Sequence, residues 1–181
     1  MNWKTLSSQY ISQHVYFTAR RDICEMPDGT IVDPYFVVEL PTSVCALAIT
    51  DNMEAILVKQ YRHPVSETLL EVPGGFVDAG ESSDKAIARE LLEETGYVFR
   101  DYIFVGRIAA NPGVLNNYTD LYLATGGIKR SSQQLDHHEE IEIMLMPVEE
   151  VRQRLLNNEI RQSLHACCLF YAFHKLDSLG R

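Results

Sequence analysis

The sequence has no apolar run long enough to cross a membrane, because charged residues interrupt every apolar stretch within about ten residues. No apolar stretch follows the first four residues, so we expect no secretory signal. Cysteines are few and lack the spacing of metal ligands, and Cys167 and Cys168 lie together in an apolar helical run that favours buried thiols. These absences predict a reduced, cytoplasmic protein without a membrane partner.

Basic residues are in the minority, with 16 Lys and Arg against 25 Asp and Glu, giving a net charge of −9. This balance disfavours the phosphate backbone of a nucleic acid as a partner. A small phosphorylated ligand stays compatible if divalent cations lie between its negative charges and those of the protein. The 181 residues, 46% of them hydrophobic and 23% charged, suit one globular domain with an appendage.

The first forty residues differ from the rest of the chain. Two β-rich runs, residues 15–26 and 30–40, flank a turn signal at residues 27–29 and predict a hairpin. An additional short strand before the hairpin is compatible with the pattern. A hairpin alone is marginally stable, so we expect the segment 1–41 to pack on the main domain, residues 42–181, or on a second subunit.

The remaining residues mix strands and helices without regular βαβ alternation, which predicts an α+β sandwich. A polar loop is expected over residues 126–138. The β-rich runs are residues 44–50, 55–61, 69–72, 102–110, 118–124 and 141–146, and the helical runs are residues 83–95, 148–156 and 160–175.

Residues 74–97 are the most informative segment. Gly74 and Gly75 end a strand where another group can approach the backbone closely. A helix then follows, with Ser82 or Ser83 as its N-cap and Gly96 as the left-handed residue that ends it.

Three carboxylates crowd one edge of this helix. Because each residue turns by about 100°, Ile87 and Leu91 define the face toward the core, and Glu90 and Glu94 lie beside it about 40° apart. Glu93 lies one step further round. Like charges at this spacing repel, and partly buried carboxylates are costly, so divalent cations would relieve both problems. The alternative is an ordinary amphipathic helix with a solvated acidic face.

The complete pattern resembles the Nudix box, and its fixed identities coincide by chance on the order of once in a hundred million windows. The resemblance covers the chain from about residue 40 to its end. It implies the Nudix fold, an α/β/α sandwich with a mixed sheet, and hydrolysis of a nucleoside diphosphate linked to another moiety. The matching residues are Gly75, Glu81, Arg89, Glu90, Leu91, Glu93, Glu94 and Gly96.

By position in this box, the resemblance makes Glu90 and Glu94 principal metal ligands and Glu93 a further ligand or the general base. The main-chain carbonyl of Gly74 would approach the metal. The implied cofactor is Mg²⁺ or Mn²⁺, and the implied chemistry is attack of water on phosphorus. Structural roles within the motif fall to Gly75, Glu81, Arg89 and Gly96.

Residues 60–64 and 70–75, with Pro112 sixteen residues after Gly96, resemble the ADP-ribose pyrophosphatase subfamily. In that group an N-terminal strand segment is exchanged between the subunits of a homodimer and helps to bind the nucleoside. Arg62 is the candidate for contacting a phosphate or the terminal ribose, and the alternative is a surface arginine at a strand end.

A late acidic segment resembles the loop in which this subfamily places a glutamate over the metals. Glu139 is the best match, as metal ligand or general base, and Glu140 is the second choice. The alternative is a solvated acidic loop. After Pro112, where some members carry an acidic residue, this chain has Asn116 and Asn117, which offer different hydrogen bonds to the distal sugar.

The substrate prediction is therefore less specific than the predicted reaction. We predict hydrolysis of ADP-ribose to AMP and ribose 5-phosphate, with GDP-mannose or another nucleotide sugar as the alternative substrate. A nucleotide-binding domain without catalysis is a further alternative, which the presence of Glu90, Glu93 and Glu94 disfavours.

Overall fold

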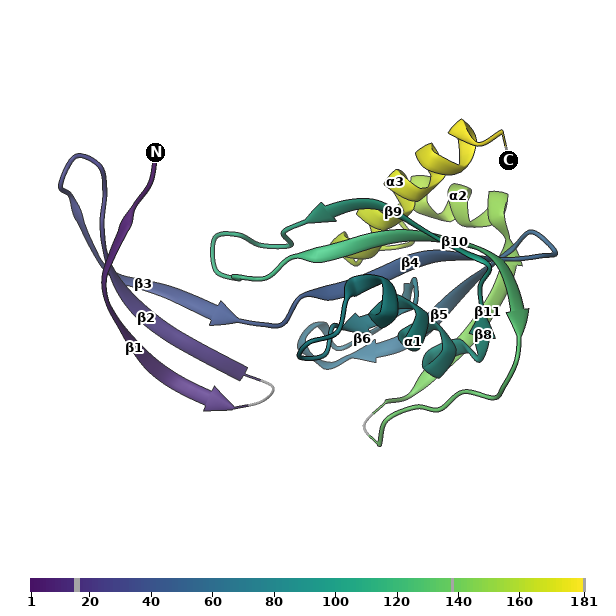
Figure 1. Cartoon of the computed structure of the whole chain (residues 1–181), viewed down its shortest axis with the longest axis horizontal. Coiled ribbons are helices and arrows are strands. Elements are labelled where there is room, and N and C mark those ends of the chain that lie inside the picture. Colours follow the sequence, from purple (N-terminus) through teal and green to yellow (C-terminus); the bar gives the residue numbers. More distant parts are fainter. Residues whose placement is uncertain (15–16, 138, 181) are drawn as a thin grey trace. The chain divides into compact units, whose positions relative to one another are not determined.

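The computed structural model describes residues 1–14, 17–137 and 139–180, which form two compact units along the chain (Figure 1). The first unit comprises Met1–Pro41 together with Ala109–Tyr118. The second comprises Thr42–Ile108 and Thr119–Arg181.

The first unit is built on a three-stranded antiparallel sheet in the order β1 (Lys4–His14), β2 (Phe17–Glu25) and β3 (Ile31–Glu39). Strands β2 and β3 are the predicted hairpin, although its first residues, 15 and 16, lie outside the described residues. Strand β1 has 11 residues, longer than the short strand considered from the sequence. Its polar composition and almost continuous exposure explain the weak signal, because no buried face imposes an alternating pattern.

The loop 109–118 belongs to the same unit because it is hydrogen-bonded to β3. The N–H of Val38 donates to the Val114 carbonyl at 2.8 Å, and the N–H of Asn116 donates to the Val38 carbonyl at 3.2 Å. The Tyr35 hydroxyl donates to the Gly113 carbonyl at 3.0 Å. The loop therefore continues the sheet beyond β3 as a short parallel bridge.

The second unit is an eight-stranded mixed sheet whose main path runs β11-β5-β4-β10-β8. Strands β4 and β10 are parallel, and the other pairs are antiparallel. Strands β6, β7 and β9 pair with β5, β4 and β10. The bounds are β4 (Ser43–Thr50), β5 (Glu54–Arg62), β6 (Glu67–Glu71), β7 (Gly74–Phe76), β8 (Tyr97–Val98), β9 (Asp101–Ile108), β10 (Thr119–Lys129) and β11 (Ile141–Pro147).

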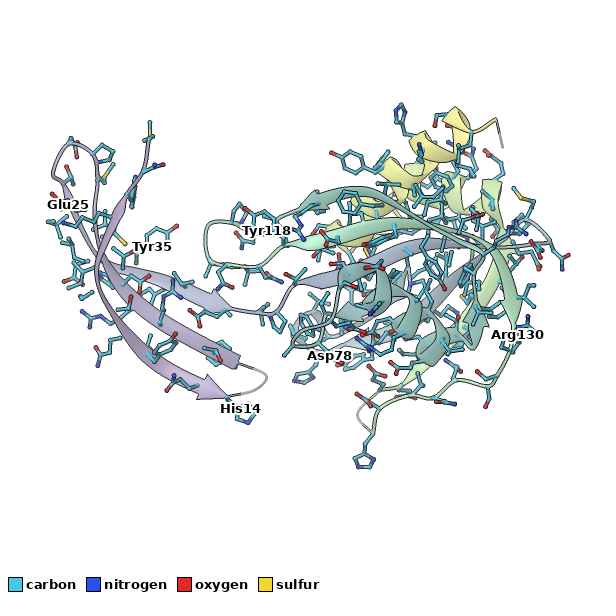
Figure 2. The ribbon with its side chains drawn as sticks, viewed as in Figure 1. His14, Glu25, Tyr35, Asp78, Tyr118 and Arg130 are labelled. Carbon is cyan, nitrogen blue, oxygen red and sulfur yellow. The ribbon has the colours of Figure 1, made fainter. Side chains whose placement is uncertain are left out.

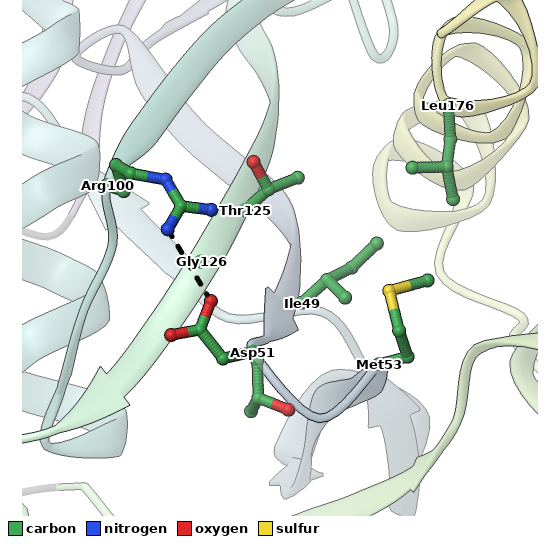
Figure 3. Close-up of a pocket in the computed structure, with 8 residues that line it drawn as sticks. Ile49, Asp51, Met53, Arg100, Thr125, Gly126 and Leu176 are labelled. Carbon is green, nitrogen blue, oxygen red and sulfur yellow. Dashed lines mark ion pairs between the residues drawn. The ribbon is translucent and has the colours of Figure 1, made fainter. Parts of the chain in front are cut away.

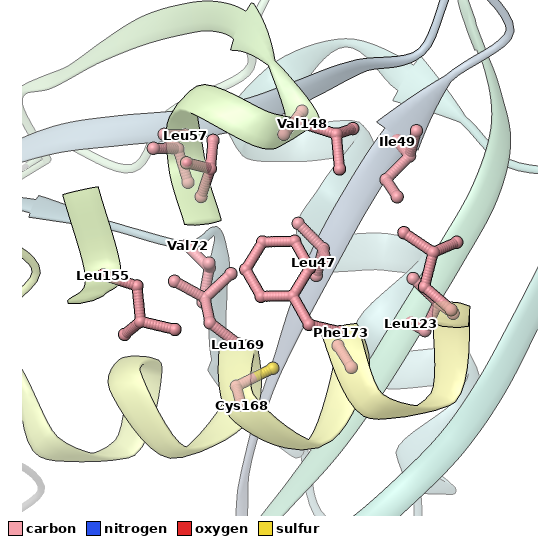
Figure 4. Packing of buried hydrophobic residues seen from close by; sticks show 14 of the residues in the cluster. Leu47, Ile49, Leu57, Val72, Leu123, Val148, Leu155, Cys168, Leu169 and Phe173 are labelled. Atoms are coloured by element: carbon pink, nitrogen blue, oxygen red, sulfur yellow. The ribbon is translucent and has the colours of Figure 1, made fainter. Parts of the chain in front are cut away.

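Helices cover both faces of this sheet, so the unit has three layers (Figure 1). Helix α1 (Ser83–Thr95) packs on one face, and helices α2 (Val148–Leu156) and α3 (Ser163–Ser178) pack on the other. Alternate residues of β4 point to opposite faces, as strand geometry requires. Val44, Ala46 and Ala48 join the α1 core, whereas Cys45, Leu47 and Ile49 join the α2 and α3 core (Figure 4). The α/β/α sandwich with a mixed sheet is the predicted fold.

Helix α1 has the predicted bounds, and Gly96 ends it in a left-handed conformation with φ of 76°. The predicted position of the serine cap is confirmed at Ser82, but no side-chain capping hydrogen bond accompanies it. The Ser83 hydroxyl donates instead to the buried Asp120 carboxylate at 2.6 Å, because β10 offers a charged acceptor beside the start of the helix.

Other boundaries also differ from the sequence predictions. Strand β10 runs on to Lys129, so the polar loop begins at Arg130 instead of Gly126, and its predicted end at His138 lies outside the described residues. Helix α3 begins at Ser163 because the Gln162 side chain caps it by accepting two main-chain N–H groups. Three short elements were missed, namely η1 (His63–Val65), β7 and β8. None of the described helices is long and apolar enough to span a bilayer.

Candidate active site

The glycine strand β7 lies against β4 on one side and α1 on the other. A Cβ atom at Gly74 would lie 2.2 Å from the Val44 carbonyl oxygen, and one at Gly75 would lie 2.4 Å from Oε1 of Glu90. At Gly74 the collision is with the backbone of β4, so glycine is required there. At Gly75 the collision is with the carboxylate of Glu90, so a side chain there would displace this acid from the backbone of β7.

Glu94 is the most deeply buried of these carboxylates, with 5% of the residue exposed. Its Oε2 accepts a hydrogen bond from the main-chain N–H of Gly74 at 2.9 Å. Burial raises the pKa of Glu94 to about 8, against the lowering effect of this hydrogen bond. The negative charges of Glu90 and Glu139 add to the increase. The carboxylate is thus held in place in surroundings that disfavour its charge.

Glu90 lies one helical turn earlier, and its side chain is 13% exposed. Burial raises its pKa to about 7, while Arg89, with its Nη1 2.9 Å from Oε1 of Glu90, acts in the opposite direction. The same Nη1 lies 3.0 Å from Oε2 of Glu93. The helix thus presents three neighbouring acids, of which the two more buried ones carry raised pKa values.

Arg89 also connects α1 to the loop before it. Its Nε and Nη2 donate to the two carboxylate oxygens of Glu81 at 3.1 and 3.0 Å. Its Nη2 donates to the Phe76 carbonyl at 2.9 Å, and Glu81 in turn accepts from the N–H of Asp78 at 3.2 Å (Asp78 is labelled in Figure 2). This is the geometry that a bracing role for Glu81 and Arg89 requires.

Glu139 lies in the exposed segment that leads into β11. Its Oε2 accepts from the N–H of Asp136 at 3.1 Å, and its own N–H donates to the Asp136 carbonyl at 3.0 Å. Its negative charge contributes to the raised pKa values of Glu90 and Glu94 and to that of Arg62. Glu139 therefore acts electrostatically on the carboxylates of α1 and on Arg62 together.

Within the described parts of the chain, no group of three or more His, Cys, Asp or Glu side chains is arranged to hold a metal ion. Instead, Glu90 and Glu93 both form ion pairs with the guanidinium of Arg89. The site nevertheless fits a hard divalent cation, because desolvated carboxylates with raised pKa values lie beside a backbone cradle that a Cβ would fill. Cation binding would require the contacts of Arg89 with these acids to loosen.

Arg62 is held at the end of β5 by a buried carboxylate. Its Nε and Nη2 donate to the two oxygens of Glu71 at 3.0 and 2.5 Å. The Glu71 side chain is 1% exposed, whereas that of Arg62 is 41% exposed. Arg62 is thus a fixed guanidinium with an accessible face, which differs from a loose surface arginine.

His165 of α3 lies behind this pair, with its Nδ1 3.4 Å from Oε2 of Glu71. That Nδ1 is buried and has no hydrogen-bond partner within the described structure. The pKa of His165 is lowered to about 4, mainly by burial; the charge of Glu71 acts in the opposite direction, and that of Arg62 acts in the same direction as burial. The imidazole is therefore neutral. Neither Glu71 nor His165 was predicted as a site residue, although Glu71 lies within the segment 70–75.

Pro112 and Asn116, the remaining predicted binding residues, lie in the first unit. The amide oxygen of Asn116 accepts from the N–H of Leu40 at 3.1 Å, and the Asn117 amide donates to the Pro41 carbonyl at 2.9 Å. Both asparagines therefore fasten the loop to the end of β3. Arg62 and the acidic residues all belong to the second unit.

A separate pocket of about 200 Å³ lies at the turn between β4 and β5 (Figure 3). Asp51 and Arg100 form an ion pair there, at 3.7 Å. Its described lining residues include none of the predicted site residues. They are Ile49, Thr50, Asp51, Met53, Arg100, Thr125, Gly126 and Leu176.

A three-layered fold in which one helix carries desolvated carboxylates beside a glycine strand defines a candidate cation-binding protein. Comparison with known proteins defines the family. Residues 39–167 match the NUDIX domain, and residues 3–38 match the nucleoside diphosphate sugar hydrolase N-terminal domain. The chain belongs to the Nudix family and is a Nudix pyrophosphohydrolase. Hydrolases of this family generally depend on divalent metal ions.

Similar proteins cover most of the chain. An ADP-ribose pyrophosphatase of Mycobacterium tuberculosis is 34% identical over 166 residues, which cover 90% of this chain and 79% of the relative. One from Bacillus subtilis is 27% identical over 169 residues, covering 93% and 91%. The crystal structure of an ADP compounds hydrolase matches with a TM-score of 0.87 and 22% identity, over 100% of this chain and 97% of that one. That structure supports the fold.

Proposed function

We propose that the chain hydrolyses the diphosphate linkage of ADP-ribose to AMP and ribose 5-phosphate. The main support for this reaction is that two desolvated carboxylates, those of Glu90 and Glu94, lie beside the backbone of Gly74 and Gly75. The substrate is suggested by the named activities of the relatives from M. tuberculosis and B. subtilis.

Glu90, Glu94 and the Gly74 carbonyl are the proposed ligands of Mg²⁺ or Mn²⁺, with Glu93 completing the set; of the two roles considered for Glu139, metal ligand or general base, we propose the second. Bound at this position, the cation would lower the pKa of a water molecule and neutralise charge on the diphosphate oxygens. Glu81 and Arg89 keep the loop before α1 and the helix in register. Gly75 and Gly96 provide the close approach and the helix end on which the ligand positions depend.

Glu139 is the proposed general base. In the reaction, the oxygen of a water molecule bonds to phosphorus while the bond from that phosphorus to the bridging oxygen breaks. The proton of the attacking water passes to the Glu139 carboxylate, and the bridging oxygen leaves on the other phosphate. Glu93 is the second candidate for the base, because its half-buried side chain lies on α1 next to both principal ligands.

Arg62 is proposed to bind a phosphate or the terminal ribose of the substrate. Its guanidinium is fixed from one side by Glu71 and keeps a partly accessible face, so it can meet an anion without losing much conformational freedom. Pro112 and Asn116 are proposed to contribute to substrate binding from the loop attached to β3.

We further propose a homodimer that exchanges its N-terminal segments. The three-stranded sheet exposes a set of large apolar side chains that a partner subunit would bury. A cytoplasmic location agrees with four free thiols. The exposed large apolar residues of this sheet are Leu6, Tyr10, Ile11, Phe17, Ile31 and Phe36, and Trp3 lies just before β1.

The test is turnover of a substrate panel by the purified protein with Mg²⁺ or Mn²⁺ and an EDTA control. The panel contains ADP-ribose, GDP-mannose, UDP-glucose, NADH, diadenosine polyphosphates and nucleoside triphosphates. Preferential release of AMP from ADP-ribose, abolished by EDTA, is the expected result. Preference for GDP-mannose would keep the mechanism and replace the substrate, whereas absence of metal-dependent turnover would favour a nucleotide-binding domain without catalysis.

A further inference from the structure

The last turn of α1 is completed by the segment that follows β10. A helix leaves its final carbonyl groups without partners inside the helix, so other groups must satisfy them. The N–H of Gln134 donates to the Glu93 carbonyl at 2.8 Å. The side-chain Nε2 of Gln133 donates to the Glu94 carbonyl, also at 2.8 Å. The end of the helix that carries the acids is therefore held by residues 133 and 134.

Gln133 makes a second hydrogen bond with the same nitrogen. Its Nε2 donates to the carbonyl of Ile141 at 3.1 Å. Ile141 is buried and opens β11, where it pairs with Gln60 of β5. A single amide group thus joins the two ends of the segment 133–141 to each other and to α1. Glu139 lies inside the segment that this amide closes.

Glu94 links Gln133 to the acidic site, because its main chain and its side chain are both hydrogen-bonded. The main-chain carbonyl of Glu94 accepts from Gln133, and the side-chain carboxylate of Glu94 accepts from the N–H of Gly74. Gln133 therefore fixes both ends of the segment 133–141 relative to Glu94, which is proposed as a principal metal ligand. A general base needs such fixing, because a displacement of about 1 Å in an active site can cost about 100-fold in rate.

We propose that Gln133 is a positioning residue that holds Glu139 in register with the carboxylates of α1. The inference rests on the proposed function, since it requires Glu139 to act in the reaction. Arg130 and Ser131 donate main-chain N–H groups to the Gly96 carbonyl, and Gln134 donates its own to that of Glu93; most substitutions would preserve these contacts. Gln133 supplies its contacts through a side chain, so a point substitution can remove them.

The first test compares Gln133→Met with Gln134→Met. A methionine side chain has a similar length to that of glutamine but no N–H donor. Gln134 is the control because its side chain is exposed and its hydrogen bond to α1 comes from the main chain. We expect Gln133→Met to lower kcat by about 10- to 100-fold with little change in KM. Gln134→Met should stay within about twofold of the parent protein. Equal kcat values for the two variants and the parent would overturn the inference.

A double-mutant cycle with Glu139→Gln separates positioning from general loss of structure. If Gln133 acts through Glu139, the double variant should be no slower than Glu139→Gln alone, within about twofold. Independent losses that multiply would overturn the inference while leaving the proposed function in place. A normal kcat for Glu139→Gln would instead remove the proposed role of Glu139, and the positioning role with it. If Gln133→Met fails to fold, Gln133→Asn, whose amide is one methylene shorter, enters the same cycle.

Discussion

The carboxylate of Glu94 and the main chain of Gly74 are joined by a hydrogen bond of 2.9 Å, although the two residues are 20 positions apart. The bond places the most buried acid of α1 directly on the glycine strand. It also explains how a carboxylate with a pKa near 8 keeps one orientation. A substitution that keeps this acceptor and removes the charge can therefore separate structure from chemistry.

Glu94→Gln is that substitution, because the amide oxygen can still accept from Gly74. We expect kcat to fall by about 100-fold or more, since loss of residues that merely support metal ligands already costs about 10- to 100-fold. Thermal unfolding should change little, because the amide keeps the acceptor for Gly74 and replaces a carboxyl whose raised pKa already favours its neutral form. The measurement is metal-dependent AMP release, combined with a melting curve.

Glu142→Gln is the matched control for this experiment. It replaces a carboxylate by an amide on an exposed side chain of β11, which forms an ion pair with Nζ of Lys59 at 3.8 Å. Its activity should equal that of the parent protein. Near-normal turnover of Glu94→Gln would remove the assignment of α1 as the metal-binding helix.

Arg62→Lys tests the fixed guanidinium. Lysine keeps the positive charge but has a single nitrogen. It cannot make two parallel hydrogen bonds to Glu71 and at the same time present further N–H donors to a substrate. Loss of about one charge-assisted hydrogen bond predicts an increase of about tenfold in KM, with a smaller change in kcat. Arg161→Lys is the control, because its exposed partner Glu67 lies on the same strand as Glu71. Steady-state kinetics with unchanged KM would contradict a substrate-binding role for Arg62.

Removing residues 1–41 tests the N-terminal segment. The deletion takes away β3, and with it the hydrogen bonds that Tyr35 and Val38 make to the loop carrying Pro112 and Asn116. We expect a monomer that is less stable and has a KM raised by about tenfold or more, since the loop loses its sheet partner. Light scattering and steady-state kinetics would measure both effects. A stable monomer with parental KM would exclude the exchanged segment.

Local signals in the sequence were sufficient for α1 and α2, whose bounds agree with the structure. The pattern of apolar residues and the glycine at position 96 act within a few neighbours along the chain. The extension of β10 to Lys129 was missed because Gly126 and Gly127 favour a loop, whereas pairing with β4 and β8 keeps the strand extended.

The sequence predicted individual residues of the candidate site but not the long-range contacts that hold them. Motif spacing placed Glu90, Glu93 and Glu94 on one helix. The contact of Gln133 with Glu94 joins residues 39 positions apart, and that of Asn116 with Leu40 joins residues 76 apart. Such contacts depend on how strands pair, and local patterning does not specify that pairing.

His165 predicts a loss of stability in acid. Its pKa is lowered to about 4 in the native state by burial, with Arg62 acting in the same direction and Glu71 in the opposite one. In the unfolded chain the imidazole returns to its ordinary pKa of about 6.5. Above pH 6.5 both states are neutral at this residue, so it makes no pH-dependent contribution. As the pH falls from about 6.5 to about 4, the unfolded state takes up a proton that the native state refuses, which costs about 3 kcal/mol of stability.

The comparison of His165→Leu with His174→Leu isolates this effect. Both residues belong to α3, and His174 is exposed. The free energy of unfolding, measured by urea titration at pH 7.5 and pH 5, should fall more steeply for the parent and His174→Leu than for His165→Leu. Because only the pH slope is compared, any constant cost of repacking at position 165 cancels. Parallel slopes for all three proteins would show that His165 is protonated without penalty in the native state, and that the site beneath Arg62 admits charge.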